Sequence, residues 1–188
     1  MLIVGLGNPT KEYENTFHNI GYLTIDALAK RLGKKIIKAE CKSLTSVKTI
    51  NGEKVVLAKP YTYMNLSGCA VKELMAKYKQ QESDLLVIVD DIDIPRFSVR
   101  TRPFGSAGTH NGMKNIVDMI GTSNFKRMRI GIGQQGYDLA SYVLSKIPSE
   151  DRKTFDATCE KVSLLLEQYI MTKDFDKLSR ESNVINKC

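Results

Sequence analysis

The sequence predicts an α/β fold: a single three-layer domain, residues 1–188, with a mixed, mostly parallel central sheet flanked by helices. Three observations support it. Short apolar runs alternate along the chain with segments whose apolar residues recur at helical spacing. Leu85–Val89 is continuously apolar, as expected of a strand covered on both faces. Asn51-Gly52 separates two β-prone runs, and both residues tolerate positive φ, so one hairpin is expected.

Each predicted element follows from the spacing of its apolar residues and from the residues that end it. Glycine ends two of the helices, and Ser67 is expected to cap a third at its start. In chain order the elements are strand Leu2–Gly5; helix Tyr22–Leu32, ended by Gly33; strands Ser43–Ile50 and Glu53–Ala58; helix Ser67–Tyr78; strand Leu85–Val89; strand Phe97–Arg102; helix Met113–Ile120, ended by Gly121; strand Arg127–Gly133; and a helical region to near the C-terminus.

The composition is that of a globular protein with a basic surface. The chain has 188 residues, 42% of them hydrophobic, and a formal net charge of +7. No apolar stretch reaches the roughly 20 residues that a membrane helix needs, and the N-terminal residues lack a signal-peptide pattern, so a cytoplasmic location is expected. The positive charge suits a partner rich in phosphate, although solvated lysines alone give many proteins the same charge.

Metal, disulfide and nucleotide sites are not expected. The four cysteines contain no CxxC pair, and the two histidines, His18 and His110, are far apart in sequence. Gly5-Leu6-Gly7 resembles the start of a dinucleotide-binding loop, but Thr10 replaces the third glycine and Pro9 interrupts the turn. Neither GxxxxGK[ST] nor GxSxG occurs, which disfavours P-loop and serine-hydrolase chemistry. We therefore expect no cofactor and no metal.

Polar residues stand where the predicted strands end or the helices begin. They are Asn8, His18, Asn65, Asp90 and Asn111. Loops at the carboxyl ends of strands gather in one crevice of an α/β sheet, so these side chains are expected to converge. Taken singly, each Asn is more often a cap or turn residue than a catalyst. Taken together, they fit a metal-free hydrolytic site, and chemistry alone leaves both interpretations open.

Five motifs, in order, resemble those of bacterial peptidyl-tRNA hydrolases. The likeness covers most of residues 1–133 at spacing similar to the family's, whereas the last third matches only loosely. The motifs are Gly5-Leu6-Gly7-Asn8-Pro9 with Tyr13 and Thr16–Gly21; Pro60–Gly68, which includes Tyr63, Met64 and Asn65; Asp90–Pro95; Gly105–Lys114; and Phe125–Gly133. The resemblance implies an esterase that cleaves the bond between a peptide and tRNA and recycles the tRNA for translation, acting as a monomer.

The resemblance also implies roles for individual residues. His18 would be the general base, and Asp90 would orient it. Asn65 and Asn111 would fix the substrate, the water or the oxyanion, and Asn8 would distinguish peptide-blocked substrates from free aminoacyl-tRNA. Further substrate contacts are expected from Tyr13, Asn19, Tyr63 and Met64, and tRNA phosphate contacts from Arg100, Arg102 and Arg129. His110 is expected to be structural.

Three positions depart from the family pattern. Thr10 and Thr109 stand where the family usually has Gly, and Phe17 stands where it has Arg, next to His18. Two other functions remain to be weighed: an RNA-binding relative without hydrolysis, and an unrelated α/β enzyme that acts on a phosphorylated metabolite. Hydrolysis of blocked aminoacyl-tRNA would exclude the first, and tRNA binding without mononucleotide binding would exclude the second.

Overall fold

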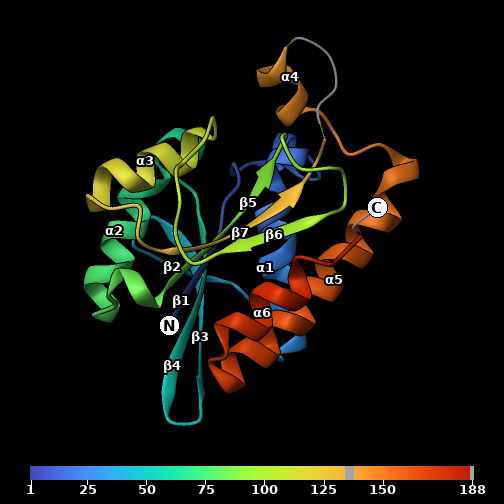
Figure 1. Ribbon diagram of the computed structural model, residues 1–188. Helices are drawn as coiled ribbons and strands as arrows, with labels where there is room; N and C mark the ends of the chain where they lie inside the picture. Colours follow the sequence, from blue (N-terminus) through green and yellow to red (C-terminus); the bar gives the residue numbers. More distant parts are fainter. Residues whose placement is uncertain (134–137, 187–188) are drawn as a thin grey trace.

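Seven strands form one mixed sheet in residues 1–133 and 138–186, which the computed structural model describes (Figure 1). The strand order is β2-β3-β4-β1-β5-β7-β6. The four central strands are parallel to one another, and β2, β3 and β6 pair antiparallel. The strands are β1 (Leu2–Gly5), β2 (Lys38–Glu40), β3 (Ser43–Ile50), β4 (Glu53–Pro60), β5 (Leu85–Asp91), β6 (Val99–Arg102) and β7 (Lys126–Gly131). The predicted α/β class and mixed sheet are confirmed.

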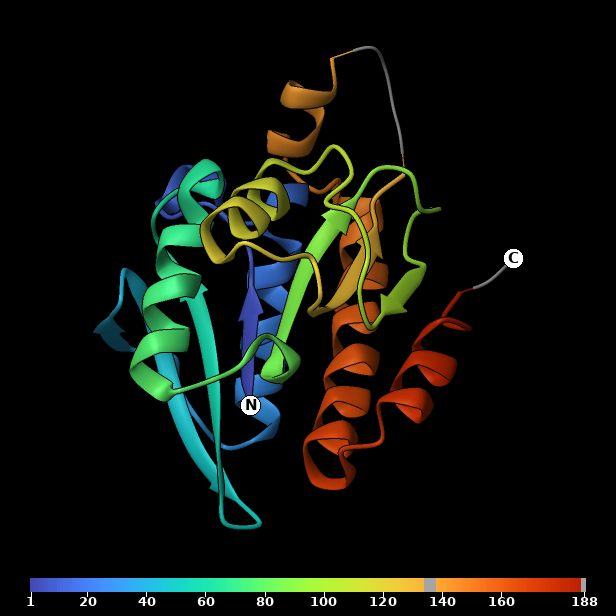
Figure 2. The ribbon, with the colours of Figure 1, turned by 60° about the vertical axis from the view of Figure 1, so that its left-hand side comes forward.

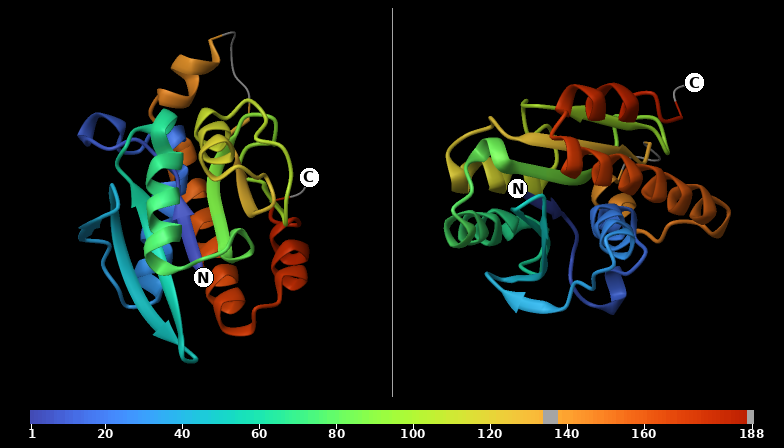
Figure 3. Two further views of the ribbon diagram at one scale, coloured as in Figure 1. Left: turned by 90° about the vertical axis from the view of Figure 1, so that its left-hand side faces the viewer. Right: turned by 90° about the horizontal axis from the view of Figure 1, so that it is seen from below.

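Helices cover both faces of the sheet, as Figures 2 and 3 show from three further directions. The pair α2 and α3 packs on one face, and α1 with α5 packs on the other, with α6 beside β6. The helices are α1 (Ile20–Arg31), α2 (Ser67–Tyr78), α3 (Asn111–Ile120), α4 (Leu139–Leu144), α5 (Ser149–Thr172) and α6 (Phe175–Ser182). In the part of the chain that the structure describes, no helix is both long and apolar enough to cross a bilayer.

Side chains of the central strands point alternately to the two faces of the sheet, and each face has its own hydrophobic core. Ile3 of β1 and Ile88 of β5 point toward α1 and α5, whereas Leu2 and Val87 point toward α2 and α3. Because both faces of β1 and β5 are covered, these strands read as continuous apolar runs in the sequence. The central strands are therefore fixed in position, and the loops that follow them start from a rigid edge.

Several element bounds differ from the prediction by one or two residues, and three differences have a clear structural reason. Ser67 is not a helix cap: it is the first residue of α2, and its hydroxyl donates to the carbonyl of Met64. The strand predicted at Phe97 begins two residues later, because Phe97 has a φ of 69° in the preceding turn. The short strand β2 was not predicted, since its three residues are mostly exposed and carry no apolar pattern.

Close contact between β1 and α1 sets the position of the first loop. A Cβ on Gly5 would lie 2.2 Å from the carbonyl oxygen of Gly21, and a Cβ on Gly21 would lie 2.5 Å from that of Leu6. Only glycine at both positions allows the backbones to approach so closely. This contact holds the start of α1 against the loop that follows β1.

Candidate active site

The predicted site residues lie at the carboxyl-terminal edge of the parallel strands. Asn8 follows β1, Asn65 follows β4 within the 3₁₀ helix η3 (Met64–Leu66), and Asp90 is the second-last residue of β5. His18 lies in the 3₁₀ helix η2 (Phe17–Asn19), and Asn111 is the first residue of α3. The structure thus brings these five residues to one edge, where parallel sheets commonly bind ligands.

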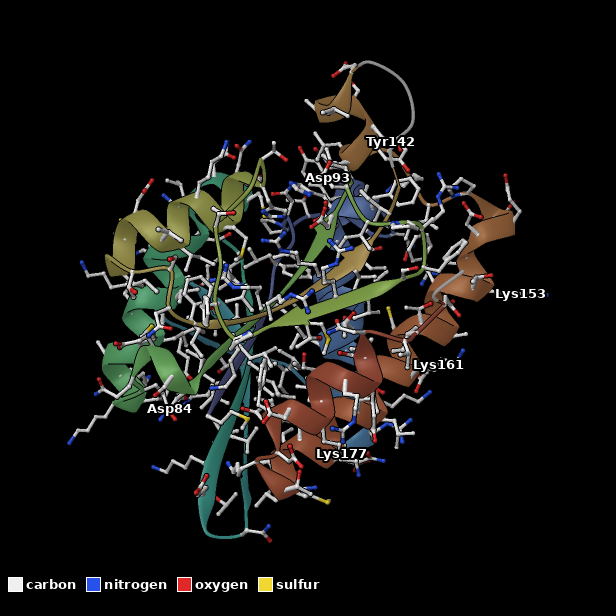
Figure 4. All side chains as sticks on the ribbon, viewed as in Figure 1. Asp84, Asp93, Tyr142, Lys153, Lys161 and Lys177 are labelled. Atoms are coloured by element: carbon white, nitrogen blue, oxygen red, sulfur yellow. The ribbon has the colours of Figure 1, made fainter. Side chains whose placement is uncertain are left out.

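A cavity of about 260 Å³ opens beside the histidines. Its lining includes His18, Asp90 and Asn111 together with Leu139 and Val143 of α4. Figure 4 shows Asp93, just beyond β5, and Tyr142 of α4 at this same end of the molecule. The cavity is large enough to admit water and part of a substrate.

His18 and Asp90 form a buried pair. His18 Nδ1 lies 2.9 Å from both carboxylate oxygens of Asp90, and the exposed fractions of the two residues are 9% and 3%. A carboxylate only accepts hydrogen bonds, so Nδ1 carries the proton and donates it. The lone pair of the imidazole is then on Nε2, which enters none of the hydrogen bonds found among residues 1–133 and 138–186. This is the arrangement that a general base requires.

His110 completes the pair as a second donor to Asp90. Its Nδ1 accepts from the backbone N–H of Met113 at 3.2 Å and so caps α3, and its Nε2 lies 3.1 Å from Asp90 Oδ1. Because Nδ1 accepts, the proton is on Nε2, which donates to the carboxylate. His110 was expected to be structural, and it both caps α3 and contacts Asp90 directly. Its position at the start of a helix, one residue before Asn111, was the available signal.

Charge and burial act in opposite directions on the pair. Burial disfavours the imidazolium, but the Asp90 carboxylate outweighs burial and raises the pKa of His18 above its ordinary value of 6.5. Burial likewise disfavours the carboxylate, but the two histidines outweigh it and lower the pKa of Asp90. Asp90 is therefore ionised whenever His18 changes its protonation state.

The ligand atoms of His18, Asp90 and His110 lie within 4.8 Å of one another, close enough to hold a metal ion. The hydrogen bonds argue against that use. A neutral imidazole that binds a cation through Nε2 must carry its proton on Nδ1, but Nδ1 of His110 faces the N–H of Met113. A metal would have to break the cap of α3 or deprotonate the ring. The three groups therefore fit a hydrogen-bonded triad better than a metal site.

The side chain of Asn8 is held in one orientation. Its Oδ1 accepts from the backbone N–H of Met64 at 2.8 Å, so the Nδ2 amide points the other way as a donor. Asn19 fixes the backbone of Asn8 through two hydrogen bonds, of 2.8 Å to its N–H and 3.0 Å to its carbonyl. Asn19 was expected to bind substrate. Both ends of its buried amide are used by Asn8, which favours a positioning role instead.

Tyr13 and Tyr63, two of the predicted substrate contacts, pack against each other. The rings of Tyr13 and Tyr63 meet edge to face with centroids 6.3 Å apart, and half of Tyr63 is exposed. Tyr63 has a φ of 59° and a ψ of 159°, a backbone conformation that non-glycine residues rarely adopt and that concentrates at functional sites. Tyr63 directly precedes Met64 and Asn65, so the strained residue sets the entry into η3.

The predicted tRNA-binding arginines share one face of the β6–β7 ladder. Arg100 pairs in register with Arg129, and Arg102 pairs with Arg127. Arg100 and Arg102 are exposed, whereas Arg129 bonds to Asp91 at 3.3 Å and to the carbonyl of Ser106 at 2.9 Å. The sequence did not distinguish Arg127, which is fully buried and donates to four backbone carbonyls, those of Gly105, Ser106, Ser123 and Phe125. Arg127 therefore holds the loops beside the arginine face.

The three departures from the family pattern have different consequences. Phe17 is buried against Tyr142 and Phe155, with the Arg96 guanidinium 5.5 Å from its ring centroid, so its side chain packs in the core. Thr10 has a φ of 79° and a ψ of 152°, which glycine tolerates and which costs other residues about 1–3 kcal/mol. Thr109 is exposed beside the cavity.

Comparisons with known proteins agree with the geometry. The family model described as peptidyl-tRNA hydrolase matches residues 2–187. The peptidyl-tRNA hydrolase of Alkaliphilus oremlandii is 46% identical over 170 residues, 90% of this chain and 92% of that protein. The one of Geobacillus kaustophilus is 44% identical over 171 residues, again 90% and 92% of the two chains. A crystal structure of the peptidyl-tRNA hydrolase from Acinetobacter baumannii superimposes with a TM-score of 0.91 at 31% identity and covers 98% of this chain and 94% of that one.

Proposed function

The chain belongs to the peptidyl-tRNA hydrolase family and hydrolyses peptidyl-tRNA, a carboxylic ester, and from this premise we propose that His18, oriented by Asp90, is the general base. The observation that carries the proposal is the pair of 2.9 Å contacts from His18 Nδ1 to the Asp90 carboxylate, which leave Nε2 as the proton acceptor.

In the proposed reaction His18 Nε2 takes a proton from water as the water oxygen attacks the ester carbonyl. A C–O bond forms to water, and the carbonyl becomes a tetrahedral oxyanion. When this intermediate collapses, the bond to the ribose oxygen of the tRNA breaks and His18 returns the proton to that oxygen. The products are the free peptide carboxyl and tRNA with its terminal hydroxyl restored. Asp90 stabilises the imidazolium between the two proton transfers and remains ionised throughout.

Amide donors supply the second part of the proposed site. Met64 occupies Oδ1 of Asn8, and Nδ2 makes no hydrogen bond within residues 1–133 and 138–186, so we assign Nδ2 to the peptide carbonyl of the substrate. A blocked substrate has such a carbonyl, and an unblocked aminoacyl-tRNA does not. Asn65 and Asn111 are exposed, and we assign their amides to the water and the developing oxyanion.

The remaining features of the proposal follow from the same geometry. The reaction needs no metal, because a base and amide donors suffice for an ester and the triad is committed to hydrogen bonds. Every proposed catalytic group comes from one chain, so a monomer with a single domain is sufficient. We propose that this monomer acts in the cytoplasm, where translation supplies its substrate.

The selectivity and metal independence can be tested together. We expect cleavage of N-acetyl-aminoacyl-tRNA and little cleavage of the same tRNA with an unblocked aminoacyl group, at rates that a chelator leaves unchanged. Release of free tRNA, measured with and without EDTA at constant salt, gives the result. Loss of cleavage with EDTA, restored by added metal, would contradict the metal-free mechanism. Equal cleavage of the two substrates would contradict the role of Asn8.

For the tRNA body, we propose that Arg100, Arg102 and Arg129 contact phosphates, with Arg102 and Arg129 at the 5′ end. The exposed guanidiniums of β6 lie on the same face as Arg129, and a folded tRNA is recognised largely through shape and phosphates. Arg129 is held by Asp91 and Ser106, so its guanidinium is already oriented before tRNA binds.

Replacing Arg102 and Arg129 with Ala is expected to weaken tRNA binding and to reduce the slope of log Kd against log salt by about one for each phosphate that is no longer neutralised. Cleavage of a minimal substrate that carries only the 3′ adenosine should change little. The control is the double variant Lys153→Ala with Lys161→Ala, which removes the same amount of charge from two exposed positions on α5 (Figure 4). Equal losses on tRNA and on the minimal substrate, or equal salt slopes for the two double variants, would contradict the assignment.

A further inference from the structure

The N-terminus of α2 is capped by a residue of another helix. Its own N-cap residue, Leu66, has no side-chain acceptor, and the hydroxyl of Ser67 donates to Met64. The N–H of Gly68, one of the free donors of the first turn, instead donates to Oδ1 of Asn115 in α3, at 2.8 Å. A bond between residues 47 positions apart thus replaces the local cap.

The two helices touch backbone to backbone at this point. A Cβ on Gly68 would lie 2.3 Å from the carbonyl oxygen of Asn115 and 2.9 Å from its Oδ1. Three residues before Asn115 in α3, a Cβ on Gly112 would lie 2.6 Å from the sulfur of Met64. The starts of α2 and α3 therefore pack in close contact, and Asn115 supplies the directional bond between them.

The junction is within one helical turn, along the chain, of two of the proposed substrate-binding amides. Asn65 precedes Gly68 by three residues in η3, and Asn111 precedes Asn115 by one helical turn in α3. Met64, also in η3, holds Asn8 through its backbone N–H. A change in the spacing of α2 and α3 would therefore move Asn65 and Asn8 relative to Asn111 and the His18–Asp90 pair.

We propose that Asn115 is a positioning residue for catalysis: by accepting from the N–H of Gly68 it fixes the distance between the Asn65 and Asn111 amides. This inference rests on the proposed roles of those two amides. Asn115 is half-buried and touches the substrate at no step; it acts through the two helix starts. The property that matters is the acceptor Oδ1, so aspartate should serve as well, with its charge favourably placed at the N-terminus of α2.

The variants Asn115→Ala and Asn115→Asp test the proposal on the minimal 3′-adenosine substrate and on full peptidyl-tRNA. Asn115→Ala should lower kcat about tenfold or more on both, because displaced catalytic groups lose rate steeply, while Kd for tRNA stays within twofold. Asn115→Asp should restore kcat to within about threefold of the wild type. Asn115→Ser, with a shorter acceptor, should give an intermediate kcat and serves if the alanine variant does not fold.

The control is Asp174→Ala, which removes a helix cap with the same 2.8 Å donor–acceptor distance, from Lys177 N at the start of α6. It should lower Tm about as much as Asn115→Ala and leave kcat unchanged, with rates measured well below both Tm values. If Asn115→Ala lowers Tm but not kcat, or if Asn115→Asp folds without restoring kcat, the positioning role is wrong.

Asn111→Ala distinguishes a failure of the proposed role of the Asn111 amide from a failure of the positioning role of Asn115. If it retains wild-type kcat, the proposed role of that amide fails, and the inference fails with it; if it loses kcat while Asn115→Ala does not, only the inference fails.

Discussion

Replacing His18 with Ala is expected to lower kcat by about 10²–10⁴-fold or more, while tRNA affinity stays within a few fold. The side chain holds the one proposed proton acceptor, Nε2, and its removal leaves Asn8 and the arginine face in place. Single-turnover cleavage of N-acetyl-aminoacyl-tRNA, with tRNA binding measured in parallel, would separate the chemical step from binding.

The Asp90 carboxylate should remain in place in His18→Ala. Without His18, Asp90 keeps a donor in His110, so the carboxylate is not left unpaired and a stable fold is expected. Turnover near that of the wild type would mean that another group activates the water. His110 is poorly suited to replace His18, because Met113 and Asp90 occupy both of its ring nitrogens.

Much of the fold followed from apolar spacing. Leu85–Val89 and Leu2–Gly5 read as strands because helices cover both of their faces, and Asn51-Gly52 forms the predicted hairpin with φ values of 52° and 81°. Element ends were less predictable, because they depend on contacts made after folding. Ser67 has the side chain of a local cap, but Asn115, of a helix that is distant in sequence, supplies the acceptor.

In the candidate site, too, some residues could be predicted from the sequence and others could not. Residues at strand ends could be placed at one edge from topology alone, and the structure brings Asn8, Asp90 and Asn111 there. Residues that act through a neighbour left no such pattern. The buried Arg127 looks like Arg129 in the sequence, and the contact of His110 with Asp90 depends on the turn before α3. Hydrogen-bond partners are set by packing in three dimensions, which a single sequence does not encode locally.

The pH dependence of the wild-type enzyme follows from the sign of the shift at His18. The carboxylate raises the pKa of His18 above 6.5, so the imidazolium persists to higher pH and the base form appears only above the raised pKa. The rate should therefore rise with pH through an ionisation above the ordinary histidine value and then level off. Asp90 remains ionised across this range and adds no second step.

Replacing Asp90 with Asn is expected to lower kcat by about 10²–10⁴ through the tautomer of His18. The Nε2 proton of His110 needs an acceptor at Oδ1, so the new amide should turn its oxygen to His110 and its NH₂ to His18. Nδ1 of His18 would then accept, its proton would move to Nε2, and the lone pair that takes the proton from water would be lost. The remaining activity should titrate at lower pH than in the wild type, because no carboxylate stabilises the imidazolium.

Profiles of kcat/KM against pH for the wild type and Asp90→Asn would test this, with Asp93→Asn as the control. Asp93 is exposed three residues further along the chain, and its substitution removes a charge near the cavity without touching His18 (Figure 4). It should leave the ionisation of His18 close to that of the wild type. If Asp90→Asn titrates at the wild-type pH, the Asp90 carboxylate does not raise the pKa of the base. If Asp93→Asn shifts the profile as far as Asp90→Asn does, general charge near the cavity sets that pKa instead. If Asp90→Asn keeps wild-type kcat on the plateau, the carboxylate does not select the tautomer.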